Sequence, residues 1–554
     1  MKRLLPILIA LAGLLGCSNR LAGTDDIQDT GSVAGLVRNS SECPRGCVDV
    51  YLIPASHNPF VSGPLPDAWH TKADASGAFR IDSVPVGVFN LEAVDSLSGR
   101  RSLLRDIRMV KGGGVKDLVA TLRAPGRVLT YLADREVSVG DYLYVPGTGH
   151  FHILNAAELA RESAEWDSLP SGALPIPRLV SHASGQEFPL AAGEPTLAPE
   201  GVIRLNPYWT WKSTRPIRIN TGSGGAAIGE TLFGFPLLIH LDSSRFDFSQ
   251  ARGKGEDIRF ARADGTPLPH EIESWDSSGK RADIWVRVDT LFADSVVGIQ
   301  MHAGNPAASE GSAAASVFGP GMNYMGAWHL AAVPPGNDVY PELSGDGSTV
   351  IAGKGPLGSD ASALTGGAVS LNGQDQYLFT DKRVQAPQTF SLSLWFRTDT
   401  RVGGKLLVFG DSLLPKESFN IDRFLWMSDD GKVNFGLFSV DLDKQILSSA
   451  QAYNDGAWHQ VTGVVSATGS ALYVDGGQVA ARSDIRAGSL INYAGYWSLG
   501  HNVKTAEPWL LAPSGLFFQG SLDEARVETR VLSPDWVKMS YQMQRPGGGV
   551  VLFP

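Results

Sequence analysis

Two carboxylates spaced two residues apart could do acid–base chemistry in this chain. Glu271 and Glu273, in the stretch PHEIESWD, would share one face of a β-strand, because the side chains of a strand alternate between its two faces. Carboxyl groups are the right residue type for general acid–base catalysis. Carboxylates so placed on an edge or turn-proximal strand are usually solvated, however. The sequence therefore favours two exposed side chains over a catalytic pair.

Histidines offer further candidates. His150 and His152 could lie on one face of a strand and bind a metal, but no third ligand is within sequence reach. His459 follows Trp458 in DGAWHQVTGVV and has no Ser, Cys or Asp partner indicated by spacing, so we expect it to be structural. The sequence contains no G-x-S-x-G, H-E-x-x-H or phosphate-cradling loop. We therefore predict that the protein is not an enzyme.

The N-terminal cysteine could carry a lipid. Lys2 and Arg3 precede an apolar run, Leu4–Leu15, that has signal-peptide length and is too short for a comfortable membrane span. The run leads into LLGC, which resembles the bacterial lipobox; the resemblance implies that Cys17 is diacylated as the first residue of the mature protein. Ser18 is compatible, by the family's rule, with delivery to the outer membrane. The alternative is an ordinary signal peptide that contains a cysteine.

Residues 1–17 are thus predicted to be a signal peptide, and residues 18–30 are a polar tether. The other two cysteines, Cys43 and Cys47 in ECPRGC, are predicted to form a local disulfide, as is usual in exported proteins. Free thiols are the alternative, and a metal site would need more ligands near by.

Composition indicates globular β-structure. Of the 554 residues, 43% are hydrophobic and 19% are charged, which argues against a disordered chain. The 63 glycines and 33 prolines favour many short strands and turns over long helices. The net charge of −10 is spread along the chain without a basic block, which argues against a nucleic-acid partner. We predict an all-β, multidomain chain of about three or four domains.

The first strand-like segments follow the tether. TKADASGAFRIDSVPVGVFNLEAV alternates apolar and polar residues between turns and points Phe79, Ile81, Phe89 and Leu91 inward. The segment resembles carboxypeptidase regulatory-like domains. This resemblance implies a prealbumin-like β-sandwich over residues 31–122 that serves as a spacer.

Residues 126–199 carry a weaker pattern. VLTYLA and VGDYLYVPGTGHFHIL are strand-like, and NAAELARESAEW is predicted to be one short helix. WDSLPSG at Trp166–Gly172 echoes IDSVPVG at Ile81–Gly87. The echo suggests a second, degenerate β-module.

A further domain is predicted over residues 207–308. Its motifs DIRF, DG, PHEIE and GNP, with Trp275 and Trp285, resemble a bacterial family of unknown function, a β-sandwich that typically precedes a laminin-G-like module. His302-Ala303-Gly304 stands where that family usually has Tyr-Tyr-Gly. Residues 309–323 have the small-residue composition of a linker between domains.

Residues 324–545 contain ordered motifs of a fourth domain: GAWHLA, GGAVSLNGQDQYLFT, TFSLSLWFRTD, the stretch around Trp458 and GSLDEARVETRVLSPDWVKMSY. They resemble the laminin-G-like, concanavalin A-like jelly roll. WHQVTGVV carries apolar residues on both faces, as a strand inside a two-sheet sandwich requires. Asp475–Gly477 then forms a tight hairpin turn. Trp458 is therefore predicted to be a packing anchor.

Jelly rolls of this kind bind sugars through aromatic side chains on concave faces and rim loops. Taken singly, each aromatic candidate here fits the core better, but together they suggest an aromatic binding edge. The candidates are Trp426, Tyr493, Tyr496, Trp497 and Trp509. The resemblance also implies a structural Ca²⁺ ion, for which Asp375 and Asp523 could supply oxygen ligands. The alternative is that both aspartates only bond turns.

These features predict a protein of the cell envelope, anchored by its lipid in the outer membrane and either periplasmic or surface-exposed. Its jelly roll would bind a polysaccharide or glycan. One alternative is a structural or adhesive lipoprotein that binds a protein partner of the envelope. Another is a polysaccharide-degrading enzyme with an unrecognised site at Glu271 or Glu273.

Overall fold

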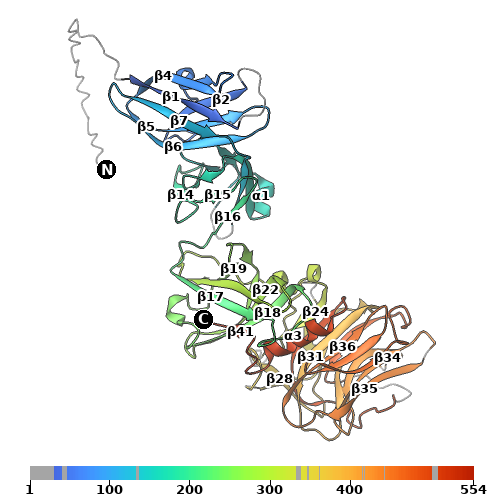
Figure 1. Cartoon of the computed structure of the whole chain (residues 1–554). Helices are drawn as coiled ribbons and strands as arrows, with labels where there is room; N and C mark the ends of the chain where they lie inside the picture. The colour runs from blue at the N-terminus through green and yellow to red at the C-terminus, as the bar shows by residue number, and fades with distance from the viewer. Residues whose placement is uncertain are drawn as a thin grey trace, which may run out of the picture. The chain divides into compact units, whose positions relative to one another are not determined.

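The computed structural model describes residues 30–39, 47–132, 137–331, 339–345, 348–360, 362–414, 416, 418–441, 443–501 and 509–554. Cys17 and Cys43 lie outside these ranges, so the lipidation and the disulfide stay predictions. The chain divides into two compact units, one mainly of residues up to Ile203 and one mainly of Arg204–Pro554. Strands supply nearly all the regular structure of both units, which confirms the predicted all-β, multidomain fold (Figure 1). None of the described helices is long and apolar enough to cross a membrane.

The first module is a sandwich of two sheets. One sheet has the order β4 (Ala78–Pro85), β1 (Thr30–Arg38), β7 (Gly114–Thr121). The other has the order β3 (His70–Lys72), β2 (Val48–Pro54), β5 (Gly87–Asp95), β6 (Arg101–Met109), and the short helix η1 (Asp67–Trp69) precedes β3. Phe79, Ile81, Phe89 and Leu91 all lie in the core between the sheets, as predicted. Cys47 belongs to the same core.

The second module is also built of short strands. Its sheets have the orders β10 (Phe151–Ile153), β9 (Tyr142–Tyr144), β13 (Arg178–Val180), β14 (Glu187–Pro189); β11 (Ser163–Leu169), β8 (Gly126–Tyr131), β16 (Val202–Leu205); and β12 (Gly172–Ala173), β15 (Thr196–Leu197). The helix is shorter than predicted: α1 covers only Ala156–Ala160, and the segment from Ser163 is the strand β11.

The echo between the two modules has a structural counterpart. Strands β4 and β11 show the same alternation of buried and exposed residues. Ser83 and Ser168, at equivalent places in IDSVPVG and WDSLPSG, have positive φ angles of 58° and 59°. Non-glycine residues rarely adopt this conformation. The shared backbone supports the interpretation of the second module as a repeat of the first.

A strand near the C-terminus of the chain completes one sheet of the central sandwich. One sheet has the order β20 (Pro267–Leu268), β19 (Arg259–Arg262), β23 (Val296–Ala303), β17 (Ser213–Asn220), β41 (Val551–Leu552). The other has the order β18 (Leu232–Asp242), β22 (Arg281–Leu291), β21 (His270–Asp276), with η2 (Phe248–Gln250) between β18 and β19. The domain predicted over residues 207–308 is therefore not contiguous in sequence, because β41 pairs with β17.

The predicted linker is part of the core. Residues 309–323 contain α2 (Ala314–Phe318) and η3 (Pro320–Met322). Val317 and Phe318 are fully buried in the central core, and the Ala313 amide donates to the carbonyl of His270 at 2.9 Å. The prediction of a linker over residues 309–323 was wrong because two large apolar residues, Val317 and Phe318, follow the run of small ones.

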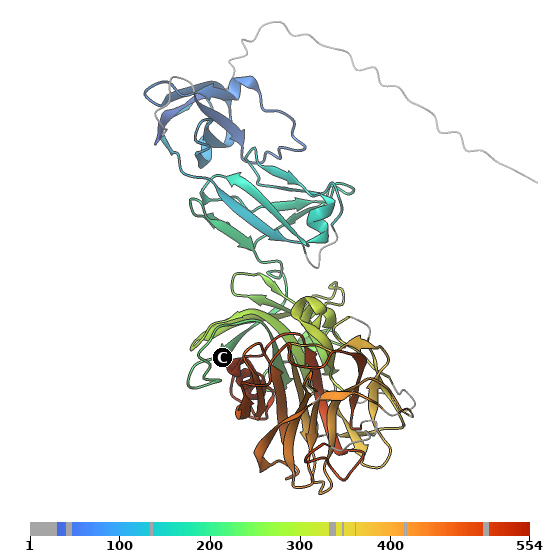
Figure 2. The same cartoon turned by 90° about the vertical axis from the view of Figure 1, so that its right-hand side faces the viewer.

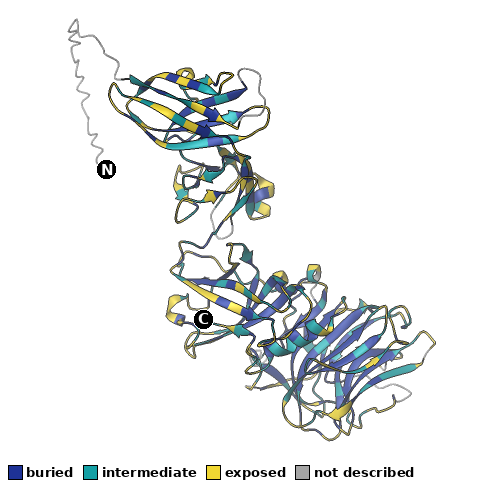
Figure 3. Ribbon diagram, in the orientation of Figure 1, coloured by how far each residue is buried: buried dark blue, intermediate teal, exposed yellow. Residues whose placement is uncertain are grey.

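The C-terminal domain is a jelly roll of two large sheets (Figure 2). The first has the order β27 (Gly358–Asp360), β28 (Ala368–Asn372), β40 (Gln519–Glu528), β31 (Phe390–Arg397), β36 (Trp458–Val465), β37 (Ser470–Val474), β38 (Gly477–Arg482), and β24 (Tyr324–Trp328) also pairs with β40. The second has the order β25 (Val339–Tyr340), β26 (Val350–Ala352), β29 (Leu378–Thr380), β39 (Ala494–Leu499), β32 (Gly404–Gly410), β33 (Ile421–Met427), β34 (Lys432–Phe438), β35 (Lys444–Ala452), and β30 (Val384–Gln385) also pairs with β39. Most of these strands are buried (Figure 3).

Strand β36 explains why WHQVTGVV is apolar on both faces. Val461 and Val465 face the core of the jelly roll, whereas Val464 belongs to the core of the central sandwich. The helix α3 (Pro534–Gln544) lies in the same joint: Trp536 contacts Phe235 of β18. The central sandwich and the jelly roll therefore share apolar packing within one unit.

The hairpin turn after β37 has the predicted geometry. Asp475 and Gly476 have φ angles of 53° and 76°, the positive values that a two-residue turn of type I′ requires. His459 is held by Asp475 at 2.8 Å and by Asp455 at 3.1 Å. Burial disfavours its charge, but the two carboxylates outweigh this and raise the pKa of His459. The sequence did not reveal these two Asp partners, and the structural role of His459 stays a prediction.

Candidate functional site

A polar cleft of about 720 Å³ lies where the jelly roll meets an edge of the central sandwich. One wall comes from the ends of β18, β21 and β22, and the other comes from residues 359–360 and 363–367 of the jelly roll. The charged and aromatic side chains that line the cleft are His240, Asp242, Arg245, Trp275, Asp276, Arg281, Asp283 and Asp360.

Trp275 is the aromatic element of the cleft. Its ring is half-buried and contacts Phe248 at 5.0 Å between ring centroids. Gly255, with a positive φ of 76°, lies so close that an added Cβ would be 2.7 Å from the indole. The indole is thus held in one place on a rigid strand, which is what a stacking platform for a ligand requires.

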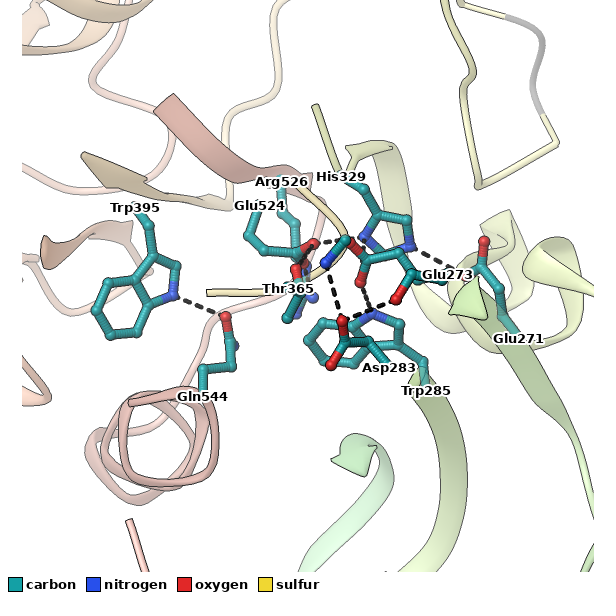
Figure 4. A network of polar contacts seen from close by, with 12 residues as sticks. Glu271, Glu273, Asp283, Trp285, His329, Thr365, Trp395, Glu524, Arg526 and Gln544 are labelled. Carbon is teal, nitrogen blue, oxygen red and sulfur yellow. Dashed lines mark hydrogen bonds and ion pairs between the residues drawn. The ribbon is translucent and has the colours of Figure 1, made fainter. Parts of the chain in front are cut away.

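Asp283 forms the floor of the cleft next to the jelly roll. It accepts hydrogen bonds from the Gly366 amide at 3.0 Å and from the Ser274 hydroxyl at 2.8 Å, and it contacts Nδ1 of His240 at 2.6 Å. Figure 4 shows Asp283 beside Trp285. Burial opposes ionisation of Asp283, but these partners outweigh it and lower its pKa. Asp283 is therefore a charged acceptor that fixes the jelly-roll loop against the sandwich.

The cleft carries more negative than positive charge. Four aspartates and two arginines line it. Asp360 is paired with Arg397 at 2.6 Å, and Arg245 donates to the carbonyl of His240 at 3.1 Å. Carboxylate and guanidinium groups set around an indole can hydrogen-bond the hydroxyl groups of a ligand whose ring stacks on the aromatic face.

Behind residues 365–367 lies a buried cluster of acidic groups around one histidine, shown in Figure 4. Nδ1 of His329 lies 2.5 Å from Oε1 of Glu524 and 3.6 Å from Oε2 of Glu273. Nε2 of the same ring lies 3.3 Å from Oε2 of Glu271. The Trp285 ring stacks on the His329 imidazole with 5.8 Å between ring centroids. The Arg526 guanidinium carbon lies over the Trp285 ring, 4.5 Å from its centroid.

Two strand irregularities aim the carboxylates into this cluster. Between Ser393 and Trp395 of β31, the pairing strand β40 contains one extra residue, and Glu524 there has a positive φ of 50°. Strand β21 has a comparable irregularity at Glu273. Extra residues of this kind re-aim side chains that regular alternation would send to opposite faces. Asp523 and Glu524 thereby both act on His329.

Burial and mutual repulsion divide the charges of the cluster. Burial, aided by the negative charge of Glu524, raises the pKa of Glu273 to about 8. Burial likewise raises the pKa of Asp523 well above its usual range, with Glu524 and Glu273 adding to the effect. For His329, burial is outweighed by the surrounding carboxylates, which raise its pKa. In the absence of a bound ion, Glu524 is therefore the charged carboxylate beside a cationic His329.

The structure corrects the predicted aromatic binding edge. Trp426, Trp497 and Trp509 are at most 6% exposed. Trp426 and Trp509 belong to one buried cluster, and Nε1 of Trp426 donates to the carbonyl of Leu511 at 2.8 Å. Their indole rings pack between β33 and the segment that begins at Trp509. These three tryptophans cannot form a platform.

The two tyrosines are placed differently. Tyr493 donates to Oδ1 of the buried Asp422 at 2.7 Å, so its hydroxyl is committed to a structural network. Tyr496 is half-buried on β39, and its role as a ligand contact stays a prediction.

The candidate calcium ligands do not come together. Asp375 lies in an exposed turn, where it pairs with Lys354 at 2.6 Å and accepts a hydrogen bond from Asn372. Asn372 pairs with Gln519 of β40, and Asp523 is four residues further along that strand, or about 13 Å. One Ca²⁺ ion cannot bind both. Asp375 fits the alternative of a turn residue, whereas Asp523 is fully buried.

The structure also bears on the histidine and glutamate candidates. His150 contacts Glu92 at 2.7 Å, and no group of three metal-ligating side chains gathers at His150 and His152 within the described ranges. Glu271 and Glu273 are not solvated as expected, because the jelly roll covers the strand that carries them. Sequence reasoning did not connect PHEIESWD, GAWHLA and GSLDEAR, although it identified each of them as a motif.

Two family models match parts of the chain. Residues 371–538 match the concanavalin A-like lectin/glucanases superfamily, and residues 254–320 match a domain of unknown function, DUF2341. Both matches confirm the resemblances found in the sequence. The resemblances to carboxypeptidase regulatory-like domains and to the lipobox stay predictions. No curated protein matches the chain.

Solved structures that match part of the chain include two toxin domains and a pentraxin. The binding domain of Paraclostridial Mosquitocidal Protein 1 is 14% identical over 40% of this chain and 52% of its own, with a TM-score of 0.31. The ligand binding domain of botulinum neurotoxin serotype D, in complex with N-acetylneuraminic acid, is 12% identical over 42% and 52%, with a TM-score of 0.30. The native heptameric SAP-like pentraxin from Limulus polyphemus is 16% identical over 30% and 75%, with a TM-score of 0.24. The chain spans about half the length of the toxin domains.

Proposed function

We propose that the protein binds a polysaccharide or glycan in the cleft between the central sandwich and the jelly roll. The cleft carries this proposal: a fixed, half-buried indole stands beside carboxylates and guanidinium groups on rigid strands. The match of the jelly roll to a lectin and glucanase superfamily supports a sugar as the ligand. The site differs from the predicted aromatic edge, whose tryptophans are buried.

The charges of the cleft indicate which glycans fit. Four aspartates and two arginines leave a formal excess of negative charge on its walls. Like charges disfavour a partner by repulsion and by leaving charged groups unpaired. We therefore propose a neutral or amino-bearing glycan, and polyanionic glycans should be retained less well.

We also propose that this site binds without cleaving. Glycoside hydrolysis requires two carboxyl groups about 5–9.5 Å apart on either side of the accessible bond. Glu271 and Glu273 do not line the cleft and are nearly inaccessible. The four aspartates that do line the cleft are already engaged: Asp283 by three partners, Asp242 and Asp276 by neighbouring serine hydroxyls, and Asp360 by Arg397. Release of reducing ends that is lost in Glu271→Gln or Glu273→Gln would instead establish an enzyme.

The test is retention of the purified protein on immobilised and insoluble polysaccharides. Trp275→Ala should weaken retention by about tenfold or more, because truncating a central aromatic anchor commonly costs about 2 kcal/mol. Arg281→Ala should weaken it by a few-fold without loss of folding, because this side chain is exposed.

Matched controls lie outside the cleft. Trp209→Ala removes another half-buried indole, and Arg218→Ala removes another exposed arginine; neither should change retention. No retention on any glycan, or equal retention of all four variants, would refute the proposed site. Binding to envelope fractions that survives glycosidase treatment would instead favour a protein partner.

We propose that Cys17 anchors this binding protein in the outer membrane. The support is the lipobox-like sequence, and the lipid would hold the strand modules and the cleft at the membrane surface. Cells fed a labelled fatty acid should label the wild-type protein and not Cys17→Ser, while Cys47→Ser should remain labelled. Equal labelling of Cys17→Ser and wild type would refute the anchor.

A further inference from the structure

The buried cluster brings together ligand atoms from three separate segments. Glu273 comes from β21 of the central sandwich, His329 follows β24, and Glu524 lies on β40 of the jelly roll. One ligand atom from each lies within 4.8 Å of the others. A cation placed among three such atoms is about 2–3 Å from each, close to the distances of nitrogen and carboxylate ligands to a metal.

Each of these three side chains also has an outer partner of the kind that orients a metal ligand. Glu271 lies 3.3 Å from Nε2 of His329, leaving Nδ1 directed at the carboxylates. The Trp285 indole donates to Glu273 at 2.8 Å, and Arg526 donates to Glu524 at 2.5 Å. Histidine ligands of metals usually donate their other ring N–H to a carboxylate in this way.

Unpartnered oxygens in the cluster provide independent evidence for a missing ligand. Neither carboxyl oxygen of Asp523 makes a hydrogen bond of normal geometry within the described residues, and Asp523 is 0% exposed. Oε1 of the buried Glu273 side chain is likewise unpartnered there. Asp523 directly precedes Glu524 on β40, so it neighbours the cluster without belonging to the group of three ligand atoms. Buried polar atoms without partners are costly, and an ion would satisfy them.

We propose that Glu273, His329 and Glu524 form a buried site for a divalent transition cation that joins the central sandwich to the jelly roll, with Asp523 as an acidic neighbour of the site. One imidazole nitrogen among carboxylate oxygens suits Zn²⁺ or Mn²⁺. Ca²⁺ takes oxygen ligands alone, so this donor set does not suit it. The ion would neutralise the carboxylates that His329 and Arg526 leave uncompensated.

The test is metal content of the full chain, freed of ions with a chelator and then dialysed against ZnCl₂ or MnCl₂. About one tightly held ion per chain is expected, together with a rise in the melting temperature, because an ion that binds the folded state stabilises it. Co²⁺ should give visible absorption bands from its nitrogen and oxygen ligands. Asp523→Asn should weaken binding more than about tenfold, the loss that even an outer partner can cause.

Asp523→Asn also distinguishes a metal from protons. If no ion binds the cluster, the melting temperatures of wild type and of Asp523→Asn should both be the same with and without the ions. If the ion binds, the variant should lose the ion-dependent rise. Glu524→Gln should behave in the same way, whereas Asp375→Asn in the exposed turn should bind like wild type. Absence of bound Zn²⁺ and Mn²⁺, or binding unchanged in both cluster variants, would overturn the proposal.

Discussion

Replacement of Arg423 with alanine is expected to lower the free energy of unfolding of the jelly roll by about 3–5 kcal/mol, the cost of breaking a buried ion pair. Arg423 and Asp422 are both fully buried and bonded to each other. Arg423 also donates to the carbonyls of Pro387 and Ile491, each at 2.8 Å. Its removal would leave Asp422 uncompensated, with only the Tyr493 hydroxyl as a side-chain donor among the described residues.

Urea-induced unfolding followed by pulse proteolysis measures this loss. Arg482→Ala serves as the control, because its pair with Asp484 is exposed and surface pairs contribute at most about 1 kcal/mol. The double variant Asp422→Asn/Arg423→Met should recover part of the stability, since it removes both charges together. A loss below about 1 kcal/mol in Arg423→Ala would contradict the expectation. It would mean that a buried Asp422 without its ion-pair partner costs the fold little stability.

Acid is expected to destabilise the first module through Glu92. This buried carboxylate lies 2.7 Å from His150 and 3.0 Å from Arg101. Burial opposes its ionisation, but His150, Arg101 and the Gly149 amide outweigh burial and lower its pKa from 4.5 to about 2. A lowered pKa in the folded state stabilises the module above the ordinary pKa. That contribution, about 3 kcal/mol at 1.4 kcal/mol per pKa unit, is lost as the pH falls from about 4.5 to about 2.

Amide hydrogen exchange in β2 and β5, corrected for the intrinsic effect of pH, measures this stability between about pH 6 and about pH 3. Wild type should lose protection as the pH falls, whereas Glu92→Gln should begin less protected and change less. Glu165→Gln should keep the wild-type profile, because Glu165 forms an exposed pair with Arg127. The same pH profile in Glu92→Gln as in wild type would show that another group is responsible.

Much of the fold was predictable because the signals were local. Alternation placed Phe79 and Leu91 in a core, and the turn at Asp475 followed from residues that accept positive φ. Both faces of WHQVTGVV were predicted to be buried, although only the structure shows that the outer face meets the central sandwich.

The candidate sites were less predictable because they depend on contacts between distant segments. Spacing in the sequence did not show whether Trp426 and Trp509 are exposed or buried. The structure buries them against each other in one cluster. The linker prediction rested on composition alone. It missed that Val317 and Phe318 pack into a core whose other residues come from distant parts of the sequence. Strand β41 returns to β17 across more than three hundred residues, which no local pattern indicates.

The sequence by itself determined the β architecture, the order of the modules and the residue types available for chemistry. Hydrophobic alternation and turn residues act over a few positions, so they can be recognised without a structure. Only the tertiary structure decided that Glu273, His329 and Glu524 meet, and that Trp275 rather than the predicted tryptophans lines an open cleft. Burial and electrostatic coupling arise from residues that are adjacent in space, and irregularities of β21 and β40 direct these side chains to one place.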